Sequence, residues 1–166
     1  PAEQIPVSPL AVLSGAPLWV WPLFVTLVVL GWRASRTRSV PVLLVYALPA
    51  LGLTTISTLV RLPEPMLVFG AHLAGYLAGA AAGFAVQRRW ILERRGGTAR
   101  LAGDWLTLAM MMTLFAAGFV NGAVAAAAPG LHASPVFLGA FALLTGMASG
   151  TFGGRAARLA ATPATA

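Results

Sequence analysis

Five apolar stretches alternate with short polar segments along the chain, and the polar segments hold most of the charged residues. Each apolar stretch is close to the roughly 20 residues that a helix needs to cross the hydrocarbon core of a membrane. We therefore predict an all-α polytopic membrane protein, a bundle of five transmembrane helices. The predicted spans are residues 16–32, 40–60, 66–86, 105–128 and 134–154.

The two ends of the chain differ from this repeating pattern. Residues 1–15 contain three prolines and one acid without a basic run, so we expect an extracytoplasmic arm rather than a signal peptide. Residues 155–166 are expected to form a cytoplasmic tail. The single domain is then the five-helix unit of residues 16–154.

Local features modify the pattern inside this domain. Pro49 lies within the second apolar stretch and predicts a kink, because proline removes a backbone donor and clashes with the preceding turn. Residues 90–92, a tryptophan followed by two aliphatic residues, predict a short amphipathic turn on the membrane surface, which Gly96 and Gly97 end. Asp104 precedes the fourth stretch and is expected to cap that helix.

Small residues recur at helical spacing in the last three apolar stretches. Without side chains along one stripe, two helices can approach closely, and such contact is what holds helices together in lipid. We expect the third stretch to be the central helix, packed mainly against other helices of its own chain rather than against a second copy. The predicted packing positions are Gly75, Gly79, Gly83, Gly118, Gly122, Gly139, Gly146 and Gly150.

Composition agrees with a membrane protein and restricts its chemistry. Hydrophobic residues make up 58% of the chain and charged residues 9%, against about 25% charged residues in soluble domains. The absence of cysteine excludes disulfides and thiolate metal sites. No hydrolase, P-loop or zinc-peptidase motif occurs, and no acid pair lies within a span. We therefore expect no enzyme activity, catalytic residue, metal or cofactor.

The positive charge is distributed unevenly between the two sides of the predicted bundle. Of the eleven arginines, Arg61 alone falls on one side and the other ten on the opposite side. The positive-inside rule then places the N-terminus outside and the C-terminus in the cytoplasm, and no nucleic-acid partner is needed to explain the charge. The arginines expected to mark this side and contact lipid head groups are Arg33, Arg36, Arg38, Arg88, Arg89, Arg94 and Arg95.

Three polar residues fall on the small-residue stripes in the outer half of the predicted bundle. They are His72, Tyr76 and Asn121. Polar groups within a membrane often mark a ligand or a solute pathway, with Arg61, Glu64 or His132 at its mouth. They also join neighbouring helices by hydrogen bonds, which is the interpretation that we favour.

Four segments carry a resemblance to a known family: APLWVWPLF from Ala16, GWRASR from Gly31, GDWLTLAMM from Gly103 and LLTGMASGTFGGRAARL from Leu143. Over about residues 16–159 the chain resembles a family of short proteobacterial integral membrane proteins with a domain of unknown function. The resemblance implies a five-span fold in the bacterial inner membrane, and it implies no activity or site residue.

Two classes of function are consistent with these features. The first is a non-catalytic membrane protein, an accessory or scaffold subunit of a larger assembly or a homo-oligomer, whose partners are membrane lipids and other membrane subunits or itself. The alternative is a small-solute transporter or channel with its site near His72 and Asn121.

Overall fold

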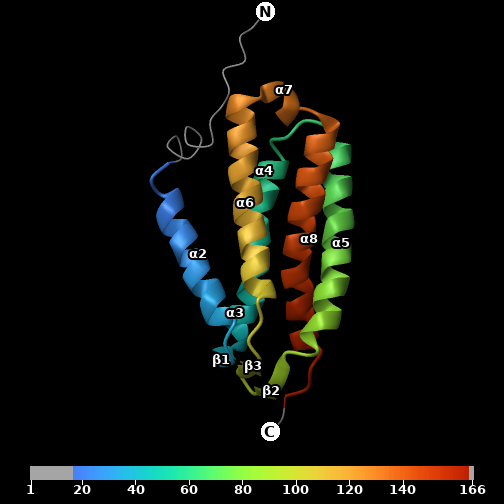
Figure 1. The fold of residues 1–166 in the computed structure, drawn as a ribbon. Helices are drawn as coiled ribbons and strands as arrows, with labels where there is room; N and C mark the ends of the chain where they lie inside the picture. The colour runs from blue at the N-terminus through green and yellow to red at the C-terminus, as the bar shows by residue number, and fades with distance from the viewer. Residues whose placement is uncertain (1–16, 165–166) are drawn as a thin grey trace, which may run out of the picture.

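The computed structural model describes residues 17–164, which form a helical bundle with a small sheet at one end (Figure 1). The predicted arm of residues 1–15 lies outside the described residues. Four helical segments are long and apolar enough to cross a membrane. They are Val42–Leu59, Pro65–Gln87, Leu106–Ala127 and Pro135–Ala160, and Val20–Ala34 is a shorter apolar helix.

The first two predicted spans differ in regularity. Helix α2 (Val20–Ala34) leads through strand β1 (Arg38–Pro41) into α3 (Val42–Ala47) and α4 (Ala50–Leu59). The break between α3 and α4 falls at Pro49, where the sequence predicted a kink, and this proline is the N-cap of α4.

The remaining helices are continuous. Helix α5 (Pro65–Gln87) and helix α6 (Leu106–Ala127) end within two residues of the predicted spans, and a short α7 (Pro129–His132) leads to α8 (Pro135–Ala160). Helix α8 continues six residues beyond residue 154, where the sequence predicted the end of the last span. Its last turns stay helical because buried side chains there pack against the rest of the bundle.

A three-stranded antiparallel sheet, which the all-α prediction missed, closes the arginine-rich end of the bundle. Strands β2 (Ile91–Arg95) and β3 (Thr98–Leu101) form a hairpin, and β1 pairs with the free edge of β3. The two-residue turn contains Gly96 with a φ of 48°, a conformation that suits glycine. The expected amphipathic turn at residues 90–92 is therefore wrong, since strand β2 begins at Ile91. The inner face of the sheet packs against α3 and the end of α8 through Val40, Val42, Val45, Ile91, Ala99, Leu101 and Leu159.

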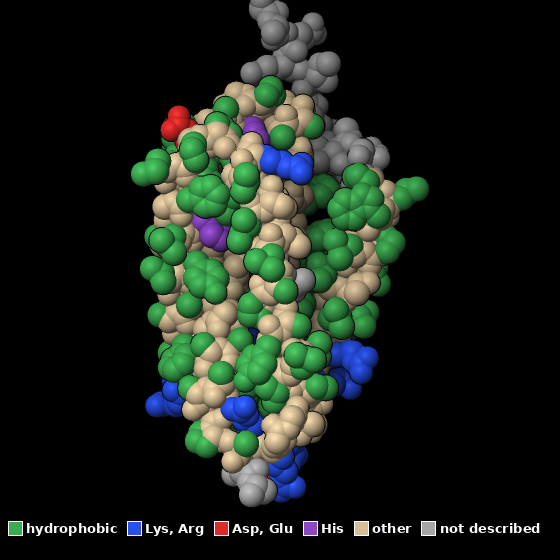
Figure 2. Space-filling model, turned by 180° about the vertical axis from the view of Figure 1, so that it is seen from behind, with side chains coloured by type: hydrophobic (Ala, Val, Ile, Leu, Met, Phe, Trp, Pro, Cys, Tyr) green, Lys and Arg blue, Asp and Glu red, His purple; other side chains and the backbone are tan. Residues whose placement is uncertain are grey.

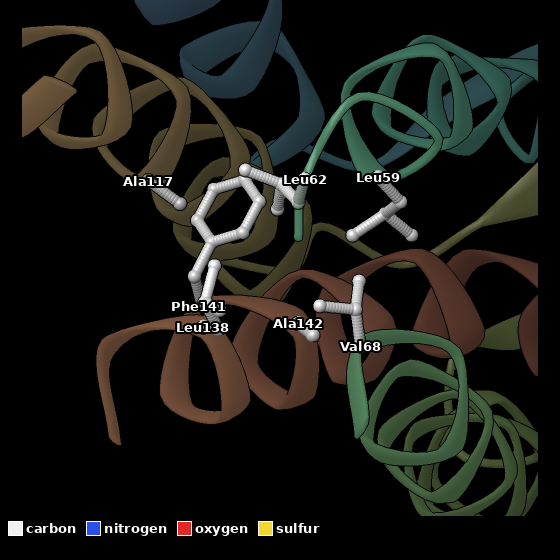
Figure 3. Packing of buried hydrophobic residues seen from close by; sticks show 7 residues of the cluster. All are labelled: Leu59, Leu62, Val68, Ala117, Leu138, Phe141 and Ala142. Carbon is white, nitrogen blue, oxygen red and sulfur yellow. The ribbon is translucent and has the colours of Figure 1, made fainter. Parts of the chain in front are cut away.

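The central helix of the bundle is α8, not the third apolar stretch as the sequence predicted. The interior of the protein buries 56% of the most apolar stretch of α8, against 22% of the corresponding stretch of α5 and 11% of that of α6. Helix α8 is buried on two faces, because its glycines contact α5 while large apolar residues on another side contact α4 and α6. The main apolar cluster, shown in Figure 3, joins Leu59, Leu62, Val68, Ala117, Leu138, Phe141 and Ala142.

The outer surface has the distribution expected of a membrane protein. Hydrophobic side chains cover most of the length of the molecule, and arginine side chains gather toward its lower end (Figure 2). Large apolar residues are widely exposed, including Met66 at 89% and Val136 at 82%. Such exposure is favourable where the surrounding medium is lipid.

Candidate functional site

The closest helix contact in the protein joins α5 and α8. A Cβ atom placed on Gly75, Gly79 or Gly83 would lie 2.2, 2.1 or 2.3 Å from a backbone carbonyl oxygen of α8. In the reverse direction, a Cβ on Gly146, Gly150 or Gly154 would lie 2.2, 2.0 or 1.9 Å from a carbonyl oxygen of α5. The two backbones therefore touch along several turns, and no larger residue fits at these positions without moving a helix.

Other glycines of the predicted packing set do not take part in such contacts. The structure places no described atom within 4 Å of a Cβ built on Gly118 or Gly122, and both residues are exposed. Gly139 would meet only Leu67, at 3.9 Å. The expectation that Gly118 and Gly122 pack against α5 and α8 is therefore wrong, although Ala117 of α6 does contact α8 in the apolar cluster. Helix α2 meets α6 at Gly31 and diverges from it toward the α7 end (Figure 1), so α2 does not cover this part of α6.

The structure separates the residues of the predicted polar site, His72, Tyr76 and Asn121, into two locations. His72 Nδ1 lies 3.2 Å from the backbone carbonyl oxygen of Ala142 in α8. Asn121 Oδ1 instead lies 3.1 Å from His132 Nε2, because α7 folds back over the end of α6. The predicted site of His72, Tyr76 and Asn121 is therefore not assembled, and the polar contacts join neighbouring elements of the fold.

His72 and Tyr76 do line a groove with α4. It has a volume of about 650 Å³ and lies between α4, α5 and α8. Its lining is mostly apolar, with three polar residues among the ten that form it. These residues are Pro49, Ala50, Gly52, Leu53, Ile56, Phe69, His72, Leu73, Tyr76 and Ser149.

A buried ion pair lies near the C-terminal end of α8. The side chains of Arg155 and Asp104 are 6% and 2% exposed, with Arg155 Nη2 2.8 Å from Asp104 Oδ2. Arg155 Nη1 donates to Asp104 Oδ1 at 3.2 Å and to Thr107 Oγ1 at 2.8 Å, and Arg155 Nε donates to Gln87 Oε1 at 2.7 Å. One guanidinium therefore ties together α5, α6 and α8, as its planar fork of donors allows.

Asp104 has a second role in the same place. Its Oδ1 accepts the backbone N–H of Thr107 at 2.8 Å, which is the capping contact that the sequence predicted for α6. Its own N–H donates to the carbonyl oxygen of Ala34 at 3.0 Å, so the end of α2 is held as well. The Asp104 carboxylate thus lies against both the Arg155 guanidinium and the N-terminus of α6, and each stabilises its negative charge.

Arginine side chains at the sheet end of the bundle also contact other parts of the chain. Trp90 lies beneath Arg155, with the guanidinium carbon 5.1 Å from the ring centroid. Arg94 Nη1 donates to the carbonyl oxygens of Leu159 and Thr162 at the end of α8, where terminal carbonyls lack helical partners. Burial lowers the pKa of Arg38, the nearby Asp104 carboxylate opposes this effect, and Arg155 adds to it.

The buried cluster of Gln87, Asp104, Thr107 and Arg155 was not predicted from the sequence, because the arginines were interpreted as markers of topology. One signal was available. Asp104 is the one acid that directly precedes an apolar stretch at the arginine-rich end, so a partner among the arginines could be expected. Comparison of the chain with protein-family models, with characterised proteins and with solved structures finds no match.

Proposed function

We propose that this chain is a non-catalytic integral membrane protein, an accessory or scaffold subunit or a homo-oligomer, that assembles through the exposed face of α6. The observation that carries the proposal is the contrast between two sets of glycines. Backbone of the same chain packs directly against the glycines at 75, 79 and 83 of α5 and at 146, 150 and 154 of α8, whereas Gly118 and Gly122 have no described atom within 4 Å.

Helices in lipid associate without a hydrophobic driving force between them. Lipid chains are as apolar as leucine, so helix pairs gain stability mainly from close van der Waals contact and hydrogen bonds. A stripe of small residues makes such contact possible, and Gly118 and Gly122 of α6 offer one that residues 17–164 leave open. Helix α6 is also the least buried of the four long apolar segments. A helix of another subunit, or of a second copy, would fit this face.

The proposal includes the membrane and the orientation that the sequence predicts. We place the chain in a bacterial inner membrane with five crossings, the N-terminus outside and the arginine-rich end in the cytoplasm. Supporting this, the arginines gather at one end of the bundle (Figure 2). Helix α2, with 15 residues, is about 22 Å long at 1.5 Å per residue, so the membrane must thin beside it or its flanking residues must complete the crossing.

The test is substitution of the open glycines. The double variant Gly118→Leu, Gly122→Leu is expected to keep its melting temperature and to lose the assembly seen when the protein is purified from native membranes with mild detergent. The matched control is Gly70→Leu on α5, which is also exposed and open. Unchanged subunit composition of the α6 variant would contradict the proposal.

The alternative of a small-solute transporter receives less support from this arrangement. Asn121 pairs with His132 rather than with His72. The groove beside His72 is lined mainly by apolar side chains, which suit a hydrophobic molecule better than a hydrated solute.

A further inference from the structure

We propose that the groove between α4, α5 and α8 is a binding site for a neutral hydrophobic alcohol taken from the bilayer, a molecule with one hydroxyl group on a long hydrocarbon body. This activity is separate from assembly through α6. The inference rests on the apolar lining, on the hydrogen-bonding state of His72 and on a buried hydroxyl of Ser149 that has no partner.

The size and lining of the groove fit the hydrocarbon part. Its volume of about 650 Å³ falls within the roughly 300–1,000 Å³ that is common for small-molecule sites. Leu53 and Leu73 are 63% and 58% exposed on its two sides, and Ile56 and Phe69 contribute further apolar surface. No arginine or carboxylate is among its lining residues, so a charged ligand would lose its hydration without gaining a partner.

His72 presents a hydrogen-bond acceptor in this groove. The carbonyl oxygen of Ala142 can only accept, so the ring nitrogen 3.2 Å from it, Nδ1, carries the hydrogen. Thr145 Oγ1 lies 3.5 Å from the same nitrogen and donates its own hydrogen to the carbonyl oxygen of Phe141 at 2.8 Å. In the neutral ring the other nitrogen, Nε2, is then an acceptor. Among residues 17–164 the hydrogen-bonding contacts of this ring are at Nδ1, so a ligand hydroxyl can donate to Nε2.

Ser149 supplies the complementary donor. It is 3% exposed, it lines the same groove, and its Oγ has no hydrogen-bond partner in the described part of the chain. A Cβ built on Gly52 would lie 3.1 Å from this oxygen, so the glycine leaves the hydroxyl the room that a larger residue would take. An unpaired buried hydroxyl costs stability, and a bound acceptor would remove that cost.

The two polar groups together specify the class of ligand. A ligand hydroxyl can donate to His72 or accept from Ser149, whereas a ketone or ether can only accept and a hydrocarbon can do neither. Because the apolar lining takes the rest of the molecule, the site favours a long-chain alcohol over an ether or alkane of the same length.

Photolabelling tests this proposal directly. The purified full-length protein in phosphatidylcholine nanodiscs is labelled with hexadecanol that carries a diazirine on its tail, and the modified peptides are mapped. We expect labelling on α4 and α5 around the groove, with competition by unlabelled hexadecanol but much weaker competition by hexadecyl methyl ether. Equal competition by the ether would mean that the groove accepts hydrocarbon alone, and it would overturn the proposal.

Substitutions separate recognition of the hydroxyl from folding. Ser149→Ala is expected to weaken labelling about 3- to 10-fold, the effect of one hydrogen bond of roughly 0.5–1.5 kcal/mol. The matched control is Ser57→Ala on α4, whose hydroxyl donates to the carbonyl oxygen of Thr54 outside the groove and should leave labelling unchanged. Ala50→Trp, which fills the groove, is expected to abolish labelling. Unaltered labelling in Ser149→Ala or in Ala50→Trp, with the fold retained by circular dichroism, would also overturn the proposal.

Discussion

Arg155 Nη2 and Asp104 Oδ2 lie 2.8 Å apart, and both side chains are almost completely enclosed by the ends of α5, α6 and α8. Asp104 is the residue that caps α6, and Arg155 lies near the end of α8. The pair therefore fixes where two long helices stand relative to each other. Because buried charges are costly to separate, this ion pair holds α6 and α8 together at one end of the bundle.

Removing one member of this pair should strongly destabilise the protein. Arg155→Met leaves Asp104 buried without its arginine, so we expect a loss of about 3–5 kcal/mol in the free energy of unfolding. Thermal unfolding in detergent measures the effect. Arg158→Met, also on α8 but only partly buried, is the control and should cost clearly less. Equal melting of the two variants would contradict the role of the buried pair.

The double variant Asp104→Leu, Arg155→Met distinguishes a lost attraction from an unpaired charge. Since it leaves no charge of the pair behind, we expect it to be more stable than Arg155→Met alone, although Gln87 and Thr107 lose a donor. A double variant less stable than either single variant would show that the remaining polar groups dominate.

The α5–α8 contact predicts a sharp difference between glycines of one helix. Gly79→Leu would force a side chain into the Met147 carbonyl oxygen, which lies 2.1 Å from the Cβ position, so we expect a loss of about 3 kcal/mol or more. Gly70→Leu on the same helix meets open space and should keep or slightly raise stability, since leucine favours helix. The yield and melting temperature of the purified variants measure this. Similar behaviour of the two variants would argue against backbone contact at Gly79.

The helices could be predicted from the sequence because their signals are local. The long apolar stretches predict the ends of α5 and α6 to within two residues, and Pro49 predicts the break between α3 and α4. The glycine spacing on α5 also indicates a smooth face. The partner of that face does not follow from spacing, because α6 and α8 both carry small residues and the choice between them depends on the packing of the whole bundle.

The sheet and the buried cluster could not be predicted because they depend on contacts between distant segments. Strand β1 meets β3 about 60 residues later, within segments whose arginines suggested only a membrane side. Arg155 was assigned to a tail, yet the continued α8 carries it into the bundle against Asp104. The groove likewise depends on the angle at which α4 leaves Pro49, which a proline predicts only as a kink.

The turn before α5 offers a way to raise stability. Glu64 has φ 59° and ψ 57°, the left-handed region, which costs most L-residues about 1–2 kcal/mol. Asparagine tolerates this region better, so Glu64→Asn should stabilise the protein by roughly 0.5–1 kcal/mol. Glu64→Ala keeps the backbone cost and is the control. A melting temperature that rises equally in both variants would point to the lost charge instead.

The proposed orientation can be tested with single cysteines, because the natural chain contains none. Gly97 in the hairpin and Gly130 in α7 are both exposed, with no described atom within 4 Å of the Cβ position, and Leu18 before α2 is 86% exposed. In intact spheroplasts a membrane-impermeant maleimide should label the Gly130→Cys and Leu18→Cys variants, and it should label Gly97→Cys only after lysis. The reason is that, in the proposed orientation, the ten arginines of the hairpin end keep that end in the cytoplasm. Labelling of Gly97→Cys before lysis would reverse the orientation, and protection of Leu18→Cys would show that the 15-residue α2 does not cross the membrane.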